Sequence, residues 1–120
     1  DRSEVVSCDC AVVLDDTLFG DGVKKGLKPG ATVIINTTKD KSQFAIDGVQ
    51  VVTVDATGLA LEILGRPITN VPLLGALIAA TGITSIPAVE AAIDDQLAPK
   101  LRKKNKKLLN KTYEIVKEAL

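Results

Sequence analysis

The stretch Ala31-Thr32-Val33-Ile34-Ile35 constrains the fold most strongly, because four of its five residues are β-branched and polar residues follow it at once. Short β-branched runs of this kind are typical of strands, and the lack of a polar alternation predicts burial on both faces. Similar runs lie on either side of it, at 10–14 and 49–54. We predict a strand at each run, with the first also buried on both faces.

The segments between these runs decide how the strands pair. Asp21 to Leu27, followed by a turn at Lys28-Pro29-Gly30, separates the first two runs, and Lys39 to Phe44 lies between the second and the third. Both connections are long enough for a short crossover helix and too long for a tight hairpin. Parallel pairing of the strands is therefore predicted.

The second half of the chain changes to a helical period. Apolar positions and flanking cap residues predict a helix over 56–64 that ends at Gly65-Arg66-Pro67, and a buried helix over 72–80 that is rich in small residues. Ser85 and Pro87 predict the start of a third helix that runs to about Leu97. A last helix is predicted over 100–120, with one apolar stripe at Leu101, Asn105, Leu108, Thr112, Ile115, Val116 and Ala119.

These elements together predict an α/β protein: a three-layer α/β/α, Rossmann-like domain with a mostly parallel sheet and a helical C-terminal half. The length of 120 residues suits one domain over 1–120, with a strand-rich half at 1–55 and a helical half at 56–120.

The composition excludes several kinds of chemistry. The sequence contains no His, which removes imidazole bases and Ser/His or Cys/His relays. Its three aromatic residues are too few for a platform that stacks nucleic-acid bases. The only cysteines, Cys8 and Cys10, are poorly placed for a local disulfide, so buried structural thiols in a reducing, cytoplasmic compartment are favoured. No apolar run is long enough to predict a membrane span.

Charge is divided unevenly along the chain. Residues 1–99 have a net charge of −6 and residues 100–120 a net charge of +6. The lysines at 103–107 form a basic helical face, for which simple solvation is favoured over nucleic-acid binding, because no arginines are placed to read bases. Contact with an acidic partner protein stays open.

Polar residues follow each predicted strand: Asp15-Asp16-Thr17, Asn36-Thr37-Thr38 and Asp55-Ala56-Thr57. The carboxyl ends of parallel strands share one edge of a sheet, which is where open α/β folds bind ligands. The competing interpretation is that Asp15, Asn36 and Asp55 cap the elements that follow them, and we favour it.

One stretch adds a resemblance to a known family. The residues from Val54-Asp55-Ala56-Thr57 to Leu64-Gly65-Arg66-Pro67-Ile68-Thr69-Asn70, then Leu74-Gly75-Ala76 and Ala80-Thr81-Gly82, resemble the gamma subunit of pyruvate and other 2-oxoacid:ferredoxin oxidoreductases. The resemblance extends over nearly the whole chain. The family's N-terminal Gly-rich loop has no counterpart, so the chain resembles the C-terminal two-thirds of a gamma subunit.

The resemblance implies a gamma component of pyruvate synthase, a cytoplasmic hetero-oligomer of anaerobic metabolism. The complex oxidatively decarboxylates pyruvate with coenzyme A to acetyl-CoA, CO₂ and reduced ferredoxin. Thiamine diphosphate, Mg²⁺, 4Fe–4S clusters and coenzyme A are implied for the complex and none for this chain alone. The implied partners are the alpha, beta and delta subunits, with ferredoxin met indirectly.

Within such a complex, this chain would have a structural or gating role near the coenzyme A path, with the small-residue helix against a neighbour. No catalytic or metal-binding residue is predicted. The residues expected at a ligand or subunit edge are Asn36, Thr37, Asp55, Thr57, Thr69 and Asn70. The alternative function is a non-enzymatic α/β interaction module that uses its basic C-terminal helix.

Overall fold

The computed structural model describes residues 8–18 and 27–120, and the chain divides between Val54 and Asp55 into two compact units. This boundary lies one residue from the predicted border between the strand-rich and helical halves. The α/β class is confirmed, while the layering of helices on the sheet and the single domain stay predictions.

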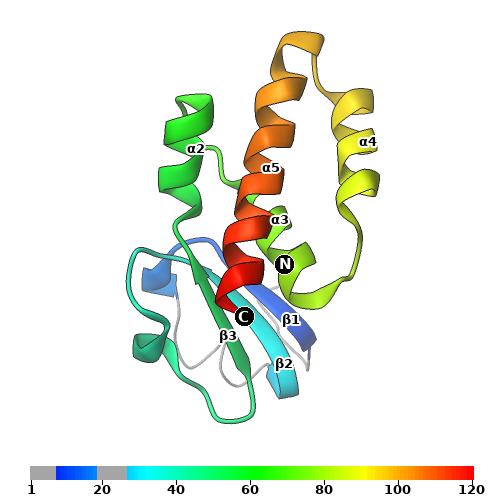
Figure 1. The fold of residues 1–120 in the computed structure, drawn as a ribbon. Helices are drawn as coiled ribbons and strands as arrows, with labels where there is room; N and C mark the ends of the chain where they lie inside the picture. Colours follow the sequence, from blue (N-terminus) through cyan, green and yellow to red (C-terminus); the bar gives the residue numbers. More distant parts are fainter. Residues whose placement is uncertain (1–7, 19–26) are drawn as a thin grey trace. The chain divides into compact units, whose positions relative to one another are not determined.

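The first unit is built on a sheet of three parallel strands in the order β1-β2-β3 (Figure 1). The strands are β1 (Cys8–Val13), β2 (Leu27–Asn36) and β3 (Gln50–Val54). Two short 3₁₀ helices, η1 (Asp16–Leu18) and η2 (Lys41–Phe44), follow the first two strands. Parallel pairing is thus confirmed, and a short helical turn lies in the connection predicted at 39–44.

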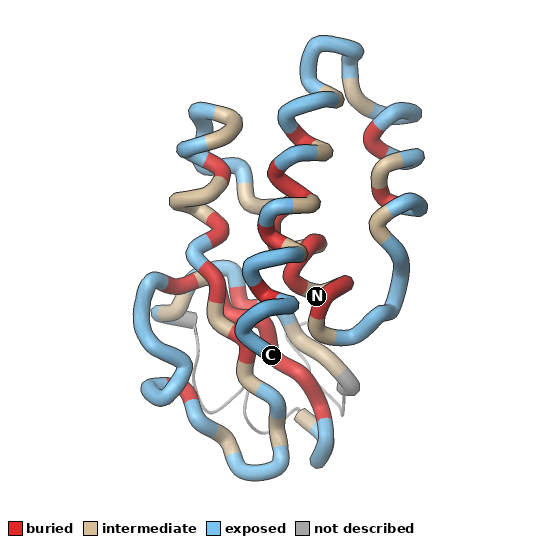
Figure 2. Tube along the Cα trace, viewed as in Figure 1, coloured by how far each residue is buried: buried red, intermediate tan, exposed pale blue. Residues whose placement is uncertain are grey.

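The middle strand is buried as its sequence predicts. Val33, Ile34 and Ile35 are fully buried. Figure 2 shows a long buried stretch along this strand. Ile34 alternates with its two neighbours, so both faces of β2 are covered. One face carries a core cluster of Val13, Val33, Ile35 and Phe44, to which η2 contributes the aromatic ring.

Two expectations about the strands were wrong. The strand β1 is not buried on both faces, because it lies at the edge of the sheet. Val12 is 40% exposed, and Leu14, just after the strand, is 60% exposed. The predicted turn at 28–30 belongs to β2 instead. Gly30 has φ +86° and its N–H bonds to Gly48 O, and the pairing shifts register between Cys8 and Cys10. These residues therefore lie in an irregular stretch of β2 rather than in a turn between strands. The rest of the predicted 21–27 connection lies outside the described residues.

The second unit contains four helices: α2 (Ala56–Leu64), α3 (Asn70–Thr81), α4 (Ile86–Gln96) and α5 (Pro99–Ala119). Their ends follow local signals. Gly65 and Gly82 adopt left-handed conformations after α2 and α3, and the Ser85 side chain accepts from Ala88 N at the start of α4. These boundaries confirm the predicted helices to within a few residues.

The helix α5 contacts each of the other three helices. Figure 2 shows buried segments that recur along this helix. Its buried residues are Asn105, Leu108, Leu109, Thr112 and Val116. Three residues of the predicted stripe, Leu101, Ile115 and Ala119, are exposed instead. Leu109, which the predicted stripe did not include, is buried in a hydrophobic cluster with Ile78 of α3 and with Val89 and Ile93 of α4.

The approach of α3 to α5 is unusually close at Gly75. A Cβ at this position would lie 2.7 Å from Leu109 O and 3.3 Å from Thr112 Cβ. Half of the twelve residues of α3 are buried within the chain itself. The buried small residues of this helix thus serve packing inside the chain, and the expectation that α3 also lies against a neighbouring subunit stays a prediction.

Candidate functional site

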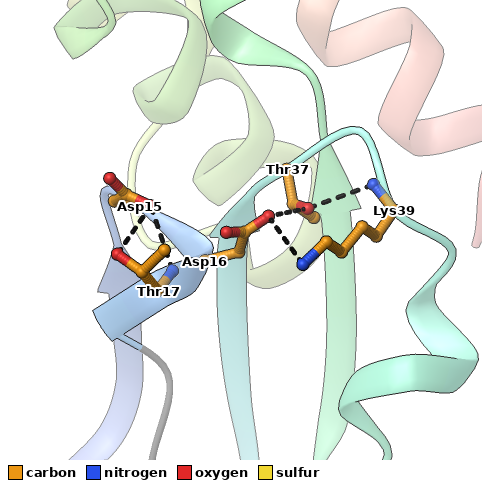
Figure 3. Close-up of polar contacts among 5 residues, drawn as sticks. All are labelled: Asp15, Asp16, Thr17, Thr37 and Lys39. Atoms are coloured by element: carbon orange, nitrogen blue, oxygen red, sulfur yellow. Dashed lines mark hydrogen bonds and ion pairs between the residues drawn. The ribbon is translucent and has the colours of Figure 1, made fainter.

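Polar side chains from two strand ends meet at the carboxyl edge of the sheet in the first unit. The Thr37 hydroxyl donates to Asp16 Oδ2 at 2.6 Å, and Lys39 N donates to Thr37 Oγ1 at 3.1 Å (Figure 3). Lys39 Nζ lies 3.8 Å from the same Asp16 oxygen. The loop after β1 is thereby joined to the loop after β2, and the predicted site residue Thr37, which is buried, stands at the centre.

Asn36 makes a second link between the two strand ends. Its side-chain Nδ2 donates to Leu14 O at 3.1 Å, across 22 residues of sequence. This hydrogen bond holds the end of β1 against the end of β2, a role beyond that of a cap for the next element.

Asp15 behaves as the capping interpretation expects. Its Oδ1 accepts from both the backbone N–H and the hydroxyl of Thr17, each at 3.0 Å (Figure 3). These two hydrogen bonds hold the pKa of the Asp15 carboxyl below its ordinary value of 3.8. A similar arrangement lowers the pKa of Asp40, whose carboxylate accepts from Ser42 at the start of η2.

The chemistry available at this edge is limited. One carboxylate oxygen of Asp15 and one of Asp16 already have donors from the same chain. No group of three His, Cys, Asp or Glu side chains is placed to hold a metal in the described ranges. The sequence also contains no His to serve as a base. The edge can position a loop or receive a polar group, but the residues described here offer no nucleophile paired with a base.

The remaining predicted site residues belong to the second unit. Asp55 caps α2 by accepting from Gly58 N at 2.9 Å, and Thr57 lies in the first turn of that helix. Asp55 thus follows the capping interpretation. Thr69 is the N-cap of α3 without a side-chain cap bond, and Asn70 begins the helix. The structure therefore brings Asn36 and Thr37 together, while the other four predicted residues lie at two helix starts.

Asn70 lines a cavity that sequence reasoning missed. The cavity has a volume of about 360 Å³ and also takes in Arg66, Lys100, Lys104 and Asn105. One signal could have revealed it: Asn105 is a polar residue in the apolar stripe of the last helix, and a buried amide there needs partners.

Cys10 does not match the expectation of a buried thiol. It is a free cysteine in β1 and is only half-buried, while nothing is described for the Cys8 side chain. None of the helices in the described part of the chain is long and apolar enough to cross a bilayer.

The parallel sheet and the helical second unit define an open α/β protein whose described polar cluster organises loops. The family model described as "Pyruvate ferredoxin/flavodoxin oxidoreductase" matches residues 1–115. The chain belongs to this family.

Individual relatives agree with this assignment. The chain is 42% identical over 118 residues to the pyruvate/ketoisovalerate oxidoreductases common subunit gamma of Thermococcus litoralis, which covers 94% of this chain and 64% of the relative. It is 41% identical over 113 residues to the pyruvate synthase subunit PorC of Methanocaldococcus jannaschii, which covers 93% of this chain and 62% of that protein. The chain thus spans less than two-thirds of the length of these relatives, and its resemblance to gamma subunits is confirmed.

Solved structures show the same fold. The pyruvate oxidoreductase subunit PORC of Thermotoga maritima superposes with a TM-score of 0.85 at 34% identity, over 95% of this chain and 66% of that one. The gamma subunit of a keto/oxoacid ferredoxin oxidoreductase from Geobacter sulfurreducens gives a TM-score of 0.75 at 24% identity, over 94% and 66%. The second comparison supports the fold alone.

Proposed function

We propose that this chain is the gamma component of a cytoplasmic pyruvate:ferredoxin oxidoreductase complex. The complex would decarboxylate pyruvate oxidatively with coenzyme A and form acetyl-CoA, CO₂ and reduced ferredoxin. The observation that carries the proposal is the 42% identity, across 94% of the chain, to a protein named as a gamma subunit.

The role proposed for the chain itself is structural. Its side chains form no described catalytic pair, and its two cysteines are fewer than the four thiolates that a 4Fe–4S cluster takes. The clusters, thiamine diphosphate and Mg²⁺ are therefore assigned to companion alpha, beta and delta subunits, from which ferredoxin would receive electrons. The Asp16, Thr37 and Lys39 contacts support this role, because they stiffen an edge that a companion subunit could meet.

The 2-oxoacid is proposed to be chosen outside this chain. The relative from Thermococcus litoralis is named as common to pyruvate and ketoisovalerate oxidoreductases. A shared subunit is not the part that distinguishes two substrates. Pyruvate is the first substrate to test, and a branched-chain 2-oxoacid is the second.

Reconstitution tests the proposal. The full protein that contains this chain is purified anaerobically from its native source, and the copurifying subunits are identified by mass spectrometry. Pyruvate-dependent and coenzyme A-dependent ferredoxin reduction is then measured before and after depletion and return of the gamma protein. Activity that falls on depletion and recovers on return supports the proposal. A protein that purifies alone and leaves this activity unchanged contradicts it and favours the interaction-module alternative.

A further inference from the structure

The cavity in the second unit, here called the α2–α5 groove, combines three features that point to one kind of occupant. The groove lies between the end of α2, the start of α3 and the first turns of α5. Its volume of about 360 Å³ is within the range of specific binding pockets. The larger hollow near Tyr113 is lined by both Glu114 and Lys117 and therefore has no single charge preference.

The first feature is uncompensated positive charge. Arg66, Lys100 and Lys104 line the groove, and no acidic residue does. Within the described ranges none of the three forms an ion pair, although Lys106 of the same helix binds Asp94 at 2.7 Å. Cations gathered around a cavity favour an occupant with carboxylates or other anionic groups.

The second feature is exposed aliphatic surface beside these cations. Ile68 is 48% exposed and Leu101 is 45% exposed, and both line the groove together with Leu64. A small inorganic anion would leave this surface in contact with water. An occupant that also carries an aliphatic side chain would cover it.

The third feature is the amide of Asn105, whose residue is only 8% exposed. Its Nδ2 donates to Leu101 O at 2.8 Å. Because a carbonyl oxygen can only accept, this bond settles which end of the amide faces Leu101. In the described part of the chain, Asn105 Oδ1 accepts no hydrogen bond, so a buried acceptor remains for an N–H group. A carboxylate offers no such donor, whereas a peptide backbone does.

We propose that the α2–α5 groove binds a peptide segment of a companion subunit, in which an aliphatic side chain is flanked by Asp or Glu. The aliphatic side chain contacts Ile68 and Leu101, the carboxylates pair with the three cations, and a backbone N–H donates to Asn105. The identity of the companion as an oxidoreductase subunit rests on the proposed function.

A second copy of this chain is a poorer occupant. In the segment Ile93-Asp94-Asp95, Ile93 is buried and Asp94 pairs with Lys106. The exposed pairs Leu61-Glu62 and Glu114-Ile115 lie inside α2 and α5, whose backbone N–H groups are already hydrogen-bonded within the helix and are not available to Asn105.

Two matched charge reversals on α5 test the assignment. The variant Lys100→Glu with Lys104→Glu alters the groove, and the control Lys103→Glu with Lys107→Glu makes the same change on exposed residues outside it. Both pairs have the same i, i+4 spacing, so they change the net charge equally and place two glutamates at the same separation on the helix. Circular dichroism checks that both variants fold.

Affinity of each full gamma protein for the companion subunits is measured by titration at low and high salt. We expect the groove variant to weaken binding by roughly 10-fold or more, with most of the loss at low salt, because reversed charges oppose a carboxylate partner. The control should change the affinity by less than about 3-fold, as rim charges do. Equal effects of the two variants, or no effect of either, overturn the assignment.

Carbodiimide coupling of the wild-type complex supplies an independent readout, since it joins lysine amines to carboxylates in direct contact. Products that link Lys100 or Lys104 to Asp or Glu of a companion subunit support the proposal. Links only to another copy of this chain overturn the proposal. The absence of links at both lysines, as expected for a groove that binds a small anion, also overturns it. If the wild-type protein binds no companion subunit, the proposed function itself is contradicted. If the groove variant binds companion subunits as tightly as wild type does, only the assignment of the groove is refuted.

Discussion

The close approach of α3 and α5 leads to a prediction in which two physical effects oppose each other. Replacing Gly75 by Ala would normally stabilise a helix interior by about 0.5–1 kcal/mol, because glycine loses more backbone entropy on folding. Here the added Cβ would lie 2.7 Å from Leu109 O and 3.4 Å from Tyr113 N. Both are backbone atoms of α5, so they cannot move aside by a side-chain rotation.

The steric clash can be removed only if the two helices move apart. This movement loosens the packing around Thr112, which is fully buried. Overpacking of this kind costs about 1–3 kcal/mol, which exceeds the gain in helix propensity. We expect Gly75→Ala to lower the free energy of unfolding by about 1–2 kcal/mol. The corresponding fall in Tm is roughly 4–8 °C for a chain of this size.

Urea and thermal unfolding followed by circular dichroism measure this change. Ala91→Gly, at an exposed position of α4, is the control for helix propensity and should cost about 1 kcal/mol. A Gly75→Ala protein that is more stable than wild type would show that propensity outweighs packing. The assigned closeness of α3 and α5 would then be refuted.

Three further changes test other parts of the structure. Leu109→Ala should cost about 2–5 kcal/mol in urea unfolding, because Leu109 is fully buried between three helices, whereas Leu101→Ala should cost less than about 1 kcal/mol. Asp55→Ala removes the cap of α2 and should cost about 0.5–2 kcal/mol, of which Asp55→Asn should restore most; equal losses would argue against the Gly58 N bond. The Asp40 carboxyl, whose pKa is lowered by the Ser42 hydroxyl and N–H, should titrate below 3.8 by NMR. Its stabilising contribution is present above the unfolded pKa and disappears as the pH falls through the folded one, so Asp40→Asn should flatten the acid limb of the stability curve.

Local signals account for most of what could be predicted about the fold. Helix ends at Gly65 and Gly82 and the helix start at Ser85 follow from residues that act on their own backbone. The β-branched run at 31–35 likewise predicts its buried strand. The start of β2 was not predicted, because the irregular stretch around Gly30 forms a hydrogen bond to Gly48 in another segment.

In the candidate site too, contacts between residues close in sequence could be predicted and contacts between distant residues could not. Asp55 is an N-cap, as short-range reasoning favours, since its partner is three residues away. The bonds from Thr37 to Asp16 and from Asn36 to Leu14 span more than 20 residues, and no spacing in the sequence specifies them. Residues that act through distant partners are therefore visible only after the strands are paired.

The sequence by itself determined the class of fold, the helices with their caps, and the family resemblance, because each rests on residue types in a local order. Only the tertiary structure decided that Gly75 seats α3 against α5, and that Arg66, Lys100 and Lys104 surround a buried Asn105 amide. Packing brings together side chains from separate elements, and the free energy of such contacts depends on three-dimensional distance rather than on position along the chain.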